Sequence, residues 1–239
     1  MSTLLHPKSL ANFIIKSIKY GKKMSNLRVK YQTVEFNDID IHTCILRDNQ
    51  QYEDIDNEAE DLGISSASWP LFGQIWPSSK VLASLMSDFD IKNKRILEVG
   101  CGIGLASLVL NHRLADITAT DYHPQVQKFL NRNSLLNNDE DIPFERTGWS
   151  DNDDTLGKFD LIIGSDLLYE RDHAHMLSEF INAHANKNCE IIIIDPGRGN
   201  QGKFTKMMIE LGYTYTCKHS DEIDTEINNG TFKIHSLVR

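Results

Sequence analysis

The chain has 239 residues, of which 40% are hydrophobic and 25% are charged. This size and composition are typical of one folded domain with a full hydrophobic core, and they exclude a fibrous or wholly disordered chain. The longest apolar runs, such as 191–194, fall far short of the roughly 18 residues of a membrane-spanning helix, so no integral membrane association is expected. Four widely spaced cysteines without a Cys-x-x-Cys pair indicate neither a disulfide framework nor a zinc site, and favour a reducing, cytoplasmic setting.

Charge is distributed unevenly along the chain, whose formal net charge is −9. Residues 1–30 contain seven Lys or Arg and no Asp or Glu, which leaves 18 basic against 34 acidic residues in the rest of the chain. An acidic body repels the phosphates of nucleic acid and favours basic partners. We therefore expect no nucleic-acid binding. No basic segment leads into a long apolar stretch and a cleavage site, so we also expect no secretory signal.

The first 65 residues are expected to form an extension to the main domain. Apolar residues recur at helical spacing within 10–18, with lysines between them, which predicts an amphipathic helix. This pattern fits a helix packed on the domain, a membrane-surface or partner-binding arm, or an organelle presequence. Two β-prone runs, 31–36 and 39–46, predict a hairpin that turns at Asn37-Asp38. The acidic stretch 53–61 lacks the sixth-position glycine of an EF-hand and predicts a solvated loop rather than a calcium site or a guide for a basic substrate.

From Arg95 onward, short apolar runs alternate with helix-like segments. The predicted strands are 95–99, 117–120, 144–147, 159–165 and 189–195, and the predicted helices are 105–110, 124–136, 174–184 and 203–211. This alternation indicates βαβ units, and so an α/β fold with a doubly wound, mostly parallel sheet. The last two runs, 213–218 and 231–238, have no helix between them, which predicts an antiparallel carboxyl-terminal edge.

A glycine-rich turn follows the first of these strands, in the order Gly100-Cys101-Gly102-Ile103-Gly104. Glycine allows a tight turn and lets a ligand approach main-chain N–H groups closely. The dinucleotide pattern G-x-G-x-x-G/A would need Gly or Ala at position 105, where this chain has Leu105. The spacing therefore makes pyrophosphate binding less favoured, although a nicotinamide-dependent oxidoreductase and a plain βα turn remain alternatives.

Asp121 ends the next predicted strand, about 20 residues beyond the glycines. A carboxylate at this place can accept hydrogen bonds from both hydroxyls of a ribose, as in other open α/β sheets that hold nucleoside cofactors. The alternative role is an N-cap for the helix that starts near Pro124.

These residues resemble the cofactor site of class I, seven-stranded S-adenosylmethionine-dependent methyltransferases. The resemblance rests on Glu98-x-Gly100-x-Gly102-x-Gly104 together with Asp121. Further motifs narrow it: Gly73-Gln74-Ile75-Trp76-Pro77 stands before a helix, Trp149 follows the third strand, and Ser165-Asp166-Leu167-Leu168-Tyr169 ends the fourth. The set is similar to the small methyltransferase-like family that modifies lysine side chains of proteins. It covers residues 70–239 and implies a Rossmann-like, seven-stranded domain over 66–239.

The resemblance also implies roles for individual residues. It places Trp76 beside the cofactor, the residues from Gly100 to Gly102 along the amino-acid portion, Asp121 on the ribose and Trp149 against the adenine. Ser165 would contact the cofactor through its backbone. No thiol chemistry is assigned to Cys101. Each tryptophan also fits an ordinary packing role.

Asp166 and Tyr169 are the predicted catalytic pair. At pH 7 a lysine with a reference pKa near 10.4 must spend about 4.6 kcal/mol to lose the proton that blocks its lone pair. Asp166 could accept a hydrogen bond from the amine and aim the lone pair, while the ring of Tyr169 could face the developing methylammonium. A turn cap at Asp166 and a packed Tyr169 are the structural alternatives.

The polar residues near this pair do not define the chemical class of the methyl acceptor. Glu170 and Asp172 suit a cationic substrate but also fit a solvated surface, and Asp195-Pro196-Gly197-Arg198 either lines the substrate cleft or forms a turn. No metal-ligand spacing is present among the nine histidines. We predict a protein-lysine methyltransferase with S-adenosylmethionine as cofactor and a lysine-bearing protein as partner. The alternatives are a small-amine, arginine or histidine acceptor, and a non-catalytic binding module; target and oligomeric state are undefined.

Overall fold

A computed structural model describes residues 27–48, 54, 57–151, 155–220 and 231–239 of the chain. In these residues, seven strands form a single sheet in the order β5-β4-β3-β6-β7-β9-β8. The strands are β3 (Arg95–Glu98), β4 (Asp116–Asp121), β5 (Phe144–Arg146), β6 (Phe159–Ser165), β7 (Ala185–Asp195), β8 (Thr214–His219) and β9 (Lys233–Val238). The helices are η2 (Leu71–Gly73), α2 (Pro77–Asp88), α3 (Leu105–His112), α4 (Val126–Leu136), α5 (His173–His184) and α6 (Gln201–Glu210).

The strand directions confirm the predicted fold class. The five strands from β5 to β7 run parallel, whereas β9 lies antiparallel between β7 and β8. The chain proceeds from β3 outward to β4 and β5, then returns to β6 on the other side of β3. The order of strands therefore reverses between β3 and β6, and ligands of open α/β sheets bind outside the carboxyl ends of the strands at such a point.

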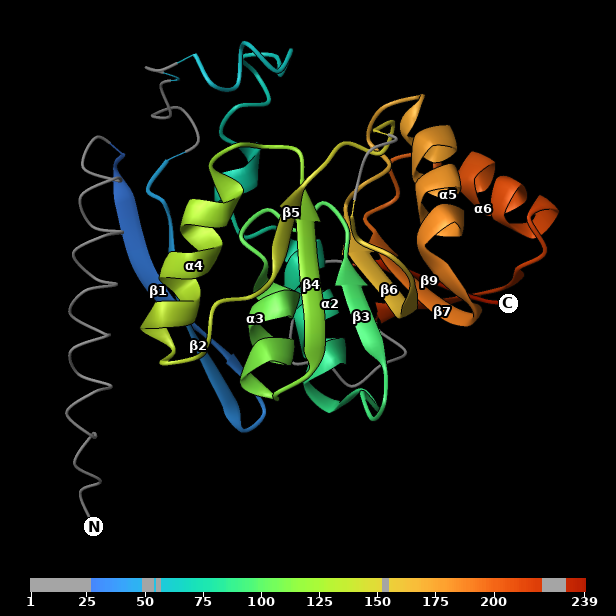
Figure 1. Ribbon diagram of the computed structural model, residues 1–239, viewed down its shortest axis with the longest axis horizontal. Helices are drawn as coiled ribbons and strands as arrows, with labels where there is room; N and C mark the ends of the chain where they lie inside the picture. The colour runs from blue at the N-terminus through green and yellow to red at the C-terminus, as the bar shows by residue number, and fades with distance from the viewer. Residues whose placement is uncertain (1–26, 49–53, 55–56, 152–154, 221–230) are drawn as a thin grey trace.

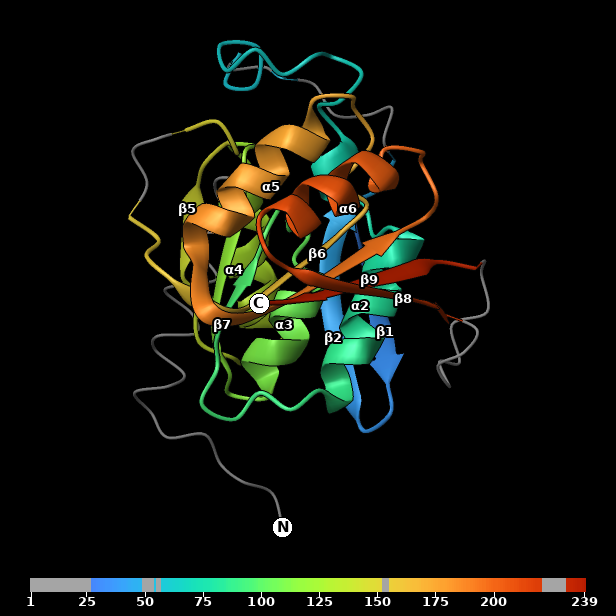
Figure 2. The ribbon, with the colours of Figure 1, turned by 90° about the vertical axis from the view of Figure 1, so that its right-hand side faces the viewer.

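Helices cover both faces of the sheet, with α2, α3 and α4 on one side and α5 and α6 on the other (Figures 1 and 2). The side chains of each strand alternate between the two layers, because successive residues of a strand point to opposite faces. In β7, Ile192 and Ile194 are buried with α2 to α4, whereas Ile191 and Ile193 are buried with α5 and α6. The continuous apolar runs of the sequence are thus explained by burial on both faces.

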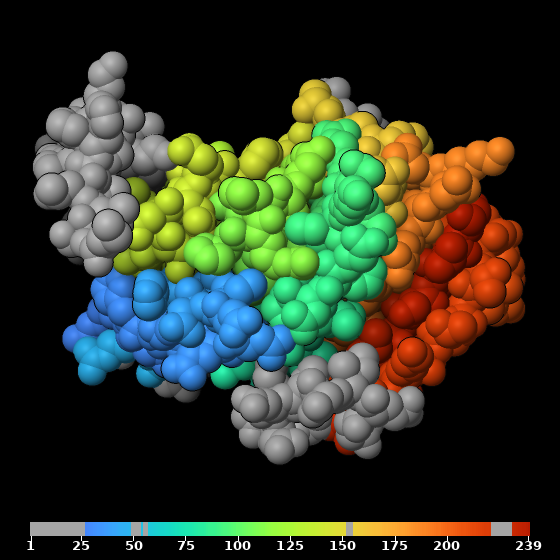
Figure 3. Space-filling model, turned by 90° about the horizontal axis from the view of Figure 1, so that it is seen from below, coloured from blue at the N-terminus to red at the C-terminus, as the bar shows by residue number. Residues whose placement is uncertain are grey.

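The predicted hairpin is confirmed as a separate two-stranded sheet of β1 (Val29–Phe36) and β2 (Ile39–Leu46). Asn37 in the two-residue turn has a φ of 45°, the left-handed conformation that asparagine tolerates in such turns. Side chains of α4 bind the outer edge of β2: Asn133 accepts a hydrogen bond from the main-chain N–H of Cys44 (2.7 Å), and Asn137 bonds both main-chain groups of His42. The hairpin and the chain around α3 and α4 form one continuous surface (Figure 3).

The acidic stretch requires a correction, because Asp54 does not lie in a solvated loop. It is 8% exposed, and its carboxylate accepts hydrogen bonds from the main-chain N–H groups of Ala59 (2.8 Å) and Glu60 (2.9 Å). Glu58 in turn contacts Gln125 and Lys128 at the start of α4. Within the described part of the stretch, Asp54 and Glu58 therefore contact the domain, whereas Asn57, Glu60 and Asp61 are exposed, as a solvated loop predicts.

The amino-terminal part was also predicted to contain a helix and to end at residue 65. The helix predicted at 10–18 lies outside the described residues, and the division at 65/66 stays a prediction. Hairpin residues such as Phe36 and Ile41 are buried in the same apolar cluster as α2, α3 and α4. None of the helices in the described ranges is both long and apolar enough to cross a membrane.

Candidate active site

A cavity of about 680 Å³ opens at the carboxyl ends of β3, β4 and β6. Its volume lies within the range of about 300–1,000 Å³ of small-molecule and cofactor sites. Ten of the eleven residues singled out from the sequence line it: Trp76, Gly100, Cys101, Gly102, Gly104, Asp121, Trp149, Ser165, Asp166 and Tyr169. Residues far apart in the sequence therefore meet where the strand order reverses.

The glycine turn between β3 and α3 forms the floor of the cavity. Gly102 has a φ of +56°, and a Cβ added there would lie 3.1 Å from the main-chain oxygen of Phe72. Only glycine fits this position without strain. Its neighbour Cys101 is buried, and burial raises the pKa of its thiol well above the ordinary value, which favours the neutral thiol over the thiolate.

Glu98 is the predicted site residue that does not line the cavity. It is 2% exposed and lies behind the turn, where its carboxylate accepts hydrogen bonds from the main-chain N–H (2.8 Å) and the hydroxyl of Ser107. Burial raises its pKa to about 7, against the weaker lowering effect of the Ser107 hydrogen bonds. Glu98 therefore holds the first turn of α3 in place.

Asp121 lies at the end of β4 with both carboxylate oxygens engaged by main-chain donors. The N–H of Gly102 donates to Oδ2 and the N–H of His123 donates to Oδ1, each at 2.8 Å. Burial raises its pKa, while these hydrogen bonds to its charged form oppose that shift. A third main-chain donor, the N–H of Tyr122, also lowers the pKa of Asp121, and a carboxylate has about four lone-pair positions, so acceptor capacity remains.

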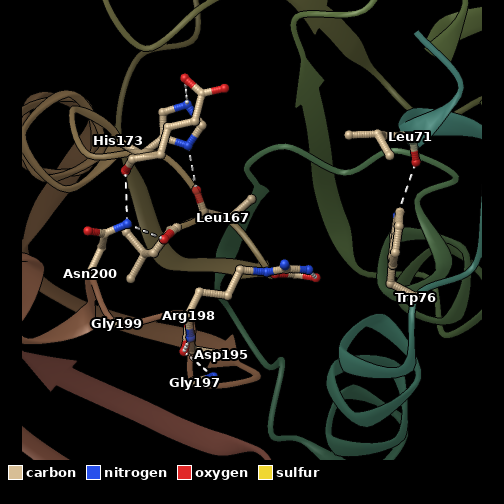
Figure 4. A network of polar contacts seen from close by, with 12 residues as sticks. Leu71, Trp76, Leu167, His173, Asp195, Gly197, Arg198, Gly199 and Asn200 are labelled. Carbon is tan, nitrogen blue, oxygen red and sulfur yellow. Dashed lines mark hydrogen bonds and ion pairs between the residues drawn. The ribbon is translucent and has the colours of Figure 1, made fainter. Parts of the chain in front are cut away.

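Two tryptophans lie on the cavity wall. Trp76 stands immediately before α2, and its indole N–H donates to the main-chain oxygen of Leu71 (3.0 Å; Figure 4). Trp149 follows β5 and packs edge-on against the ring of His173, with ring centroids 5.1 Å apart. Each indole therefore has an anchoring contact and also presents apolar surface to the cavity.

The segment after β6 presents the predicted catalytic pair. Asp166 follows Ser165, has a φ of +55°, and donates its main-chain N–H to the oxygen of Ile194 in β7 (2.8 Å). Tyr169 is 48% exposed, and its ring packs edge-on against His173 at 4.5 Å. Burial of its hydroxyl, helped by nearby carboxylates, raises its pKa to about 12, so the phenol stays protonated at neutral pH.

Arg198, in the loop after β7, extends its side chain into the site (Figure 4). Its guanidinium pairs with Asp166 through two parallel contacts, Nε to Oδ1 at 2.5 Å and Nη2 to Oδ2 at 2.8 Å. Both structures considered for 195–198 occur: Asp195 closes a turn by accepting from the main-chain N–H groups of Gly197 and Arg198, and Arg198 lines the cavity. Glu170 is exposed and Asp172 precedes α5, so neither is a wall of the cavity.

A further wall of the cavity was not predicted from the sequence. It is formed by Phe72, which precedes α2, and by Tyr122 and His123, which follow β4. Phe72 stacks on the ring of His123 at 4.0 Å, and the hydroxyl of Tyr122 donates to the main-chain oxygen of Leu62 (2.7 Å). Burial lowers the pKa of His123 to about 4, so this ring is neutral, and its Nδ1 accepts a hydrogen bond from the main-chain N–H of Gln125 (3.2 Å). No motif marks these residues, because the contacts join positions about 50 to 60 apart that only the fold brings together.

The cavity suits a cofactor that carries a nucleoside and an amino-acid group. The main chain of the glycine turn from Gly100 to Gly104 lines the cavity. The buried Asp121 carboxylate supplies hydrogen-bond acceptors, and Trp149 supplies an aromatic surface. Acceptors for hydroxyls and a flat apolar wall thus occur in one cavity, as S-adenosylmethionine requires.

Comparison with known proteins identifies the family. Residues 58–210 match the model of a lysine methyltransferase family, which covers more than half of the chain. The chain belongs to the lysine methyltransferase family. Its similarity to individual family proteins is moderate: it is 28% identical over 153 residues to calmodulin-lysine N-methyltransferase of Arabidopsis thaliana, and 31% identical over 115 residues to protein N-lysine methyltransferase METTL21A of Danio rerio. These alignments cover 59% and 44% of this chain.

The alignments cover only part of each lysine methyltransferase relative. The matched regions cover 50% of the Arabidopsis protein and 52% of the Danio protein, so the chain spans about half the length of these relatives. A further relative, the histidine protein methyltransferase 1 homolog of Dictyostelium discoideum, is 32% identical over 104 residues, covering 41% of this chain and 34% of its own.

Solved structures show the same fold at low sequence identity. A methyltransferase from Pyrococcus furiosus aligns with a TM-score of 0.55 and 17% identity, over 77% of this chain and 98% of its own. The ribosomal protein L11 methylase from Lactobacillus delbrueckii subsp. bulgaricus aligns with a TM-score of 0.51 and 21% identity, over 68% and 78%. The predicted seven-stranded, Rossmann-like methyltransferase fold is therefore confirmed.

Proposed function

We propose that the protein is an S-adenosylmethionine-dependent methyltransferase that acts on lysine side chains of a protein in the cytoplasm. One observation carries the proposal: the glycine turn and Asp121 lie in the same cavity as Asp166 and Tyr169. A cofactor held by the first pair and an amine held by the second would meet inside one volume. The family match and the two lysine methyltransferase relatives support the acceptor class.

Cofactor binding would use the floor and walls of the cavity. Main-chain groups from Gly100 to Gly102 would hold the amino-acid portion, Asp121 would accept from the ribose hydroxyls, and Trp149 would cover the adenine. Trp76 and Ser165 would complete the wall. Glu98 would act indirectly, by fixing the start of α3 through Ser107.

When bound, S-adenosylmethionine would supply an electrophilic methyl group. The amine lone pair would form the C–N bond, the C–S bond would break with its electrons left on sulfur, and a proton would leave the nitrogen for solvent. Asp166 would accept an N–H hydrogen bond from the amine and so aim the lone pair. The ring of Tyr169 would face the cationic product, an interaction worth about 0.5–2 kcal/mol. Alignment of the reacting atoms would account for most of the acceleration.

Several observations support the finer parts of the proposal. All four cysteines are free thiols, which fits a reducing compartment. The net charge of −9 favours a basic protein partner over nucleic acid. The catalytic domain would comprise residues 66–239, with 1–65 as its extension.

The test is transfer of tritiated methyl groups from S-adenosylmethionine into a cell extract, with protein, nucleic acid and small molecules counted separately. We expect label in protein, recovered as methyl-lysine after hydrolysis, and at least a tenfold loss with Asp166→Ala. Glu179→Gln, which removes a carboxylate from the exposed side of α5, is the matched control and should retain full activity.

Other outcomes would replace the proposal. Recovery of methyl-histidine, methyl-arginine or a labelled small molecule would change the acceptor class. Stabilisation by NAD or NADP instead of S-adenosylhomocysteine would contradict the cofactor assignment. Tight binding of S-adenosylhomocysteine without transfer to any fraction would favour a non-catalytic binding module.

A further inference from the structure

Asp166, the residue proposed to receive the acceptor amine, already carries a cationic partner. The Arg198 guanidinium engages both of its oxygens, at 2.5 and 2.8 Å. The Asp166 side chain is 11% exposed and that of Arg198 is 43% exposed, so the carboxylate lies inward and the guanidinium lies at the mouth. A carboxylate has about four lone-pair positions, and this fork uses two of them.

The loop around Arg198 is built to hold this contact. The fully buried Asp195 accepts hydrogen bonds from the main-chain N–H groups of Gly197 (2.6 Å) and Arg198 (3.2 Å). On the other side of the loop, the amide of Asn200 donates to the main-chain oxygens of Leu168 (2.9 Å) and Glu170 (3.2 Å; Figure 4). Asn200 thereby joins the loop after β7 to the loop after β6. Arg198 is held between two fixed residues of its own loop, Asp195 before it and Asn200 after it.

An unpaired carboxylate would oppose the proposed reaction. A negative charge within about 4–6 Å of an amine stabilises its ammonium form and raises its pKa by about 1–3 units. An ammonium ion has no lone pair with which to attack a methyl group. A neighbouring positive charge has the opposite effect on an amine and favours its neutral, nucleophilic form.

Arg198 supplies the positive charge that faces the carboxylates of the cavity. Among the described residues that line the cavity, Arg198 is the only Lys or Arg, whereas three aspartates line it: Asp121 from β4, Asp151 after β5 and Asp166 after β6. The other titratable residues that line or adjoin the cavity are Cys101 in the glycine turn, Tyr122 and His123 after β4, Tyr169 and Glu170 in the loop after β6, His173 of α5, and Asp195 of β7. His123 and Tyr169 are neutral at pH 7, so neither offsets the carboxylates.

We propose that Arg198 neutralises Asp166, so that the acceptor amine enters the site as a free base while Asp166 still accepts one of its N–H hydrogen bonds. Arg198 is thus a positioning residue that acts through Asp166 and sets the protonation state of the substrate. This proposal rests on the proposed lysine methyltransferase function. It assigns the transfer step a pH dependence that is governed by a residue outside the predicted catalytic pair.

The test compares wild type, Arg198→Lys and Arg198→Gln. Tritiated methyl transfer into extract protein is measured as methyl-lysine from pH 6 to pH 10, and S-adenosylhomocysteine affinity is measured by calorimetry. For Arg198→Gln we expect the rising limb of the rate profile to move upward by about one pH unit. The rate would then be about tenfold lower at pH 7 and would recover at high pH, with cofactor affinity unchanged. Arg198→Lys should retain the wild-type limb.

A double variant separates charge from structure. Asp166→Asn combined with Arg198→Gln restores the net charge of the wild-type pair, so its rate should be low but its pH limb should match wild type. A uniform loss of rate by Arg198→Gln at every pH would overturn the proposal and leave Arg198 as a structural support. An absence of methyl-lysine with wild-type protein would contradict the proposed function itself.

Discussion

The carboxylate of Asp121 and the main-chain N–H of Gly102 are joined by a hydrogen bond of 2.8 Å, which ties the end of β4 to the glycine turn after β3. The second oxygen of the same carboxylate binds the N–H of His123. One side chain therefore fixes the shape of the cavity floor and also faces the cavity. Its removal should affect the site more than the fold.

Asp121→Ala should weaken binding of S-adenosylhomocysteine at least tenfold, because both the ribose acceptor and the support for the turn are lost. Calorimetric titration measures this change. Asp160→Asn is the matched control: Asp160 is a strand carboxylate outside the cavity that binds the main-chain N–H of Arg95. The control should retain the wild-type Kd; equal Kd values for wild type and Asp121→Ala would refute the ribose assignment.

Gly102→Ala should lower both stability and cofactor affinity. The left-handed φ costs a residue with a Cβ about 1–2 kcal/mol, and the new methyl would lie 3.1 Å from the oxygen of Phe72. Gly202→Ala, in α6, is the comparison, because open space surrounds its Cβ and a helical position favours alanine by about 0.8–1 kcal/mol. Thermal unfolding with and without S-adenosylhomocysteine should show a lower Tm and a smaller ligand shift for the first variant alone.

Glu98 should make stability depend on pH in the direction opposite to a carboxylate whose pKa is lowered by folding. Its pKa is raised from 4.5 to about 7, so between these values the folded protein holds a proton that the unfolded chain has released. The free energy of unfolding contributed by Glu98 therefore falls as pH rises from 4.5 to 7 and is level above it. Glu98→Gln removes this dependence.

Urea unfolding of wild type and Glu98→Gln at pH 5 and pH 8 measures the effect. The free energy of unfolding of Glu98→Gln, taken relative to wild type, should rise by about 3 kcal/mol from pH 5 to pH 8, because only wild type loses the Glu98 contribution over this range. The raised pKa of Asp121 is present in both proteins and cancels in this comparison. A constant difference across the range would show that Glu98 titrates normally.

Asn133→Ala should destabilise the protein by about 1–3 kcal/mol, because the buried N–H of Cys44 loses its acceptor. Asn137→Ala removes hydrogen bonds that lie nearer solvent, and water can replace them, so its loss should be smaller. Urea unfolding distinguishes the two. Equal losses of unfolding free energy would mean that water can also replace the hydrogen bond between Asn133 and Cys44.

The order of strands and helices from residue 95 onward followed from the sequence because the signals are local. Strands buried on both faces appear as continuous apolar runs, and helices between them have a period of 3.6. The glycine turn was also visible, since its chemistry depends on adjacent residues. The hairpin was predictable from the two residues of its turn, of which Asn37 has the required φ.

Interactions between distant positions were not predictable. Arg198 and Asp166 are 32 positions apart and meet only because β6 and β7 are neighbours in the sheet. The solvated loop predicted for the acidic stretch was wrong for Asp54 alone, because a carboxylate that binds two main-chain N–H groups can be buried. Composition shows charge but not the partners that neutralise it.

The four isoleucines of β7, from Ile191 to Ile194, are all buried, so after a shift of the strand by one residue three of these four positions would still hold isoleucine. The hydrophobicity of this run therefore specifies the register of the strand only at its ends. That information lies at its end, in Asp195, whose buried carboxylate must reach the N–H groups of the following loop. A slip by one residue would displace the loop by about 3.3 Å and carry Arg198 out of reach of Asp166, so strand register and the charge state of the site are specified together.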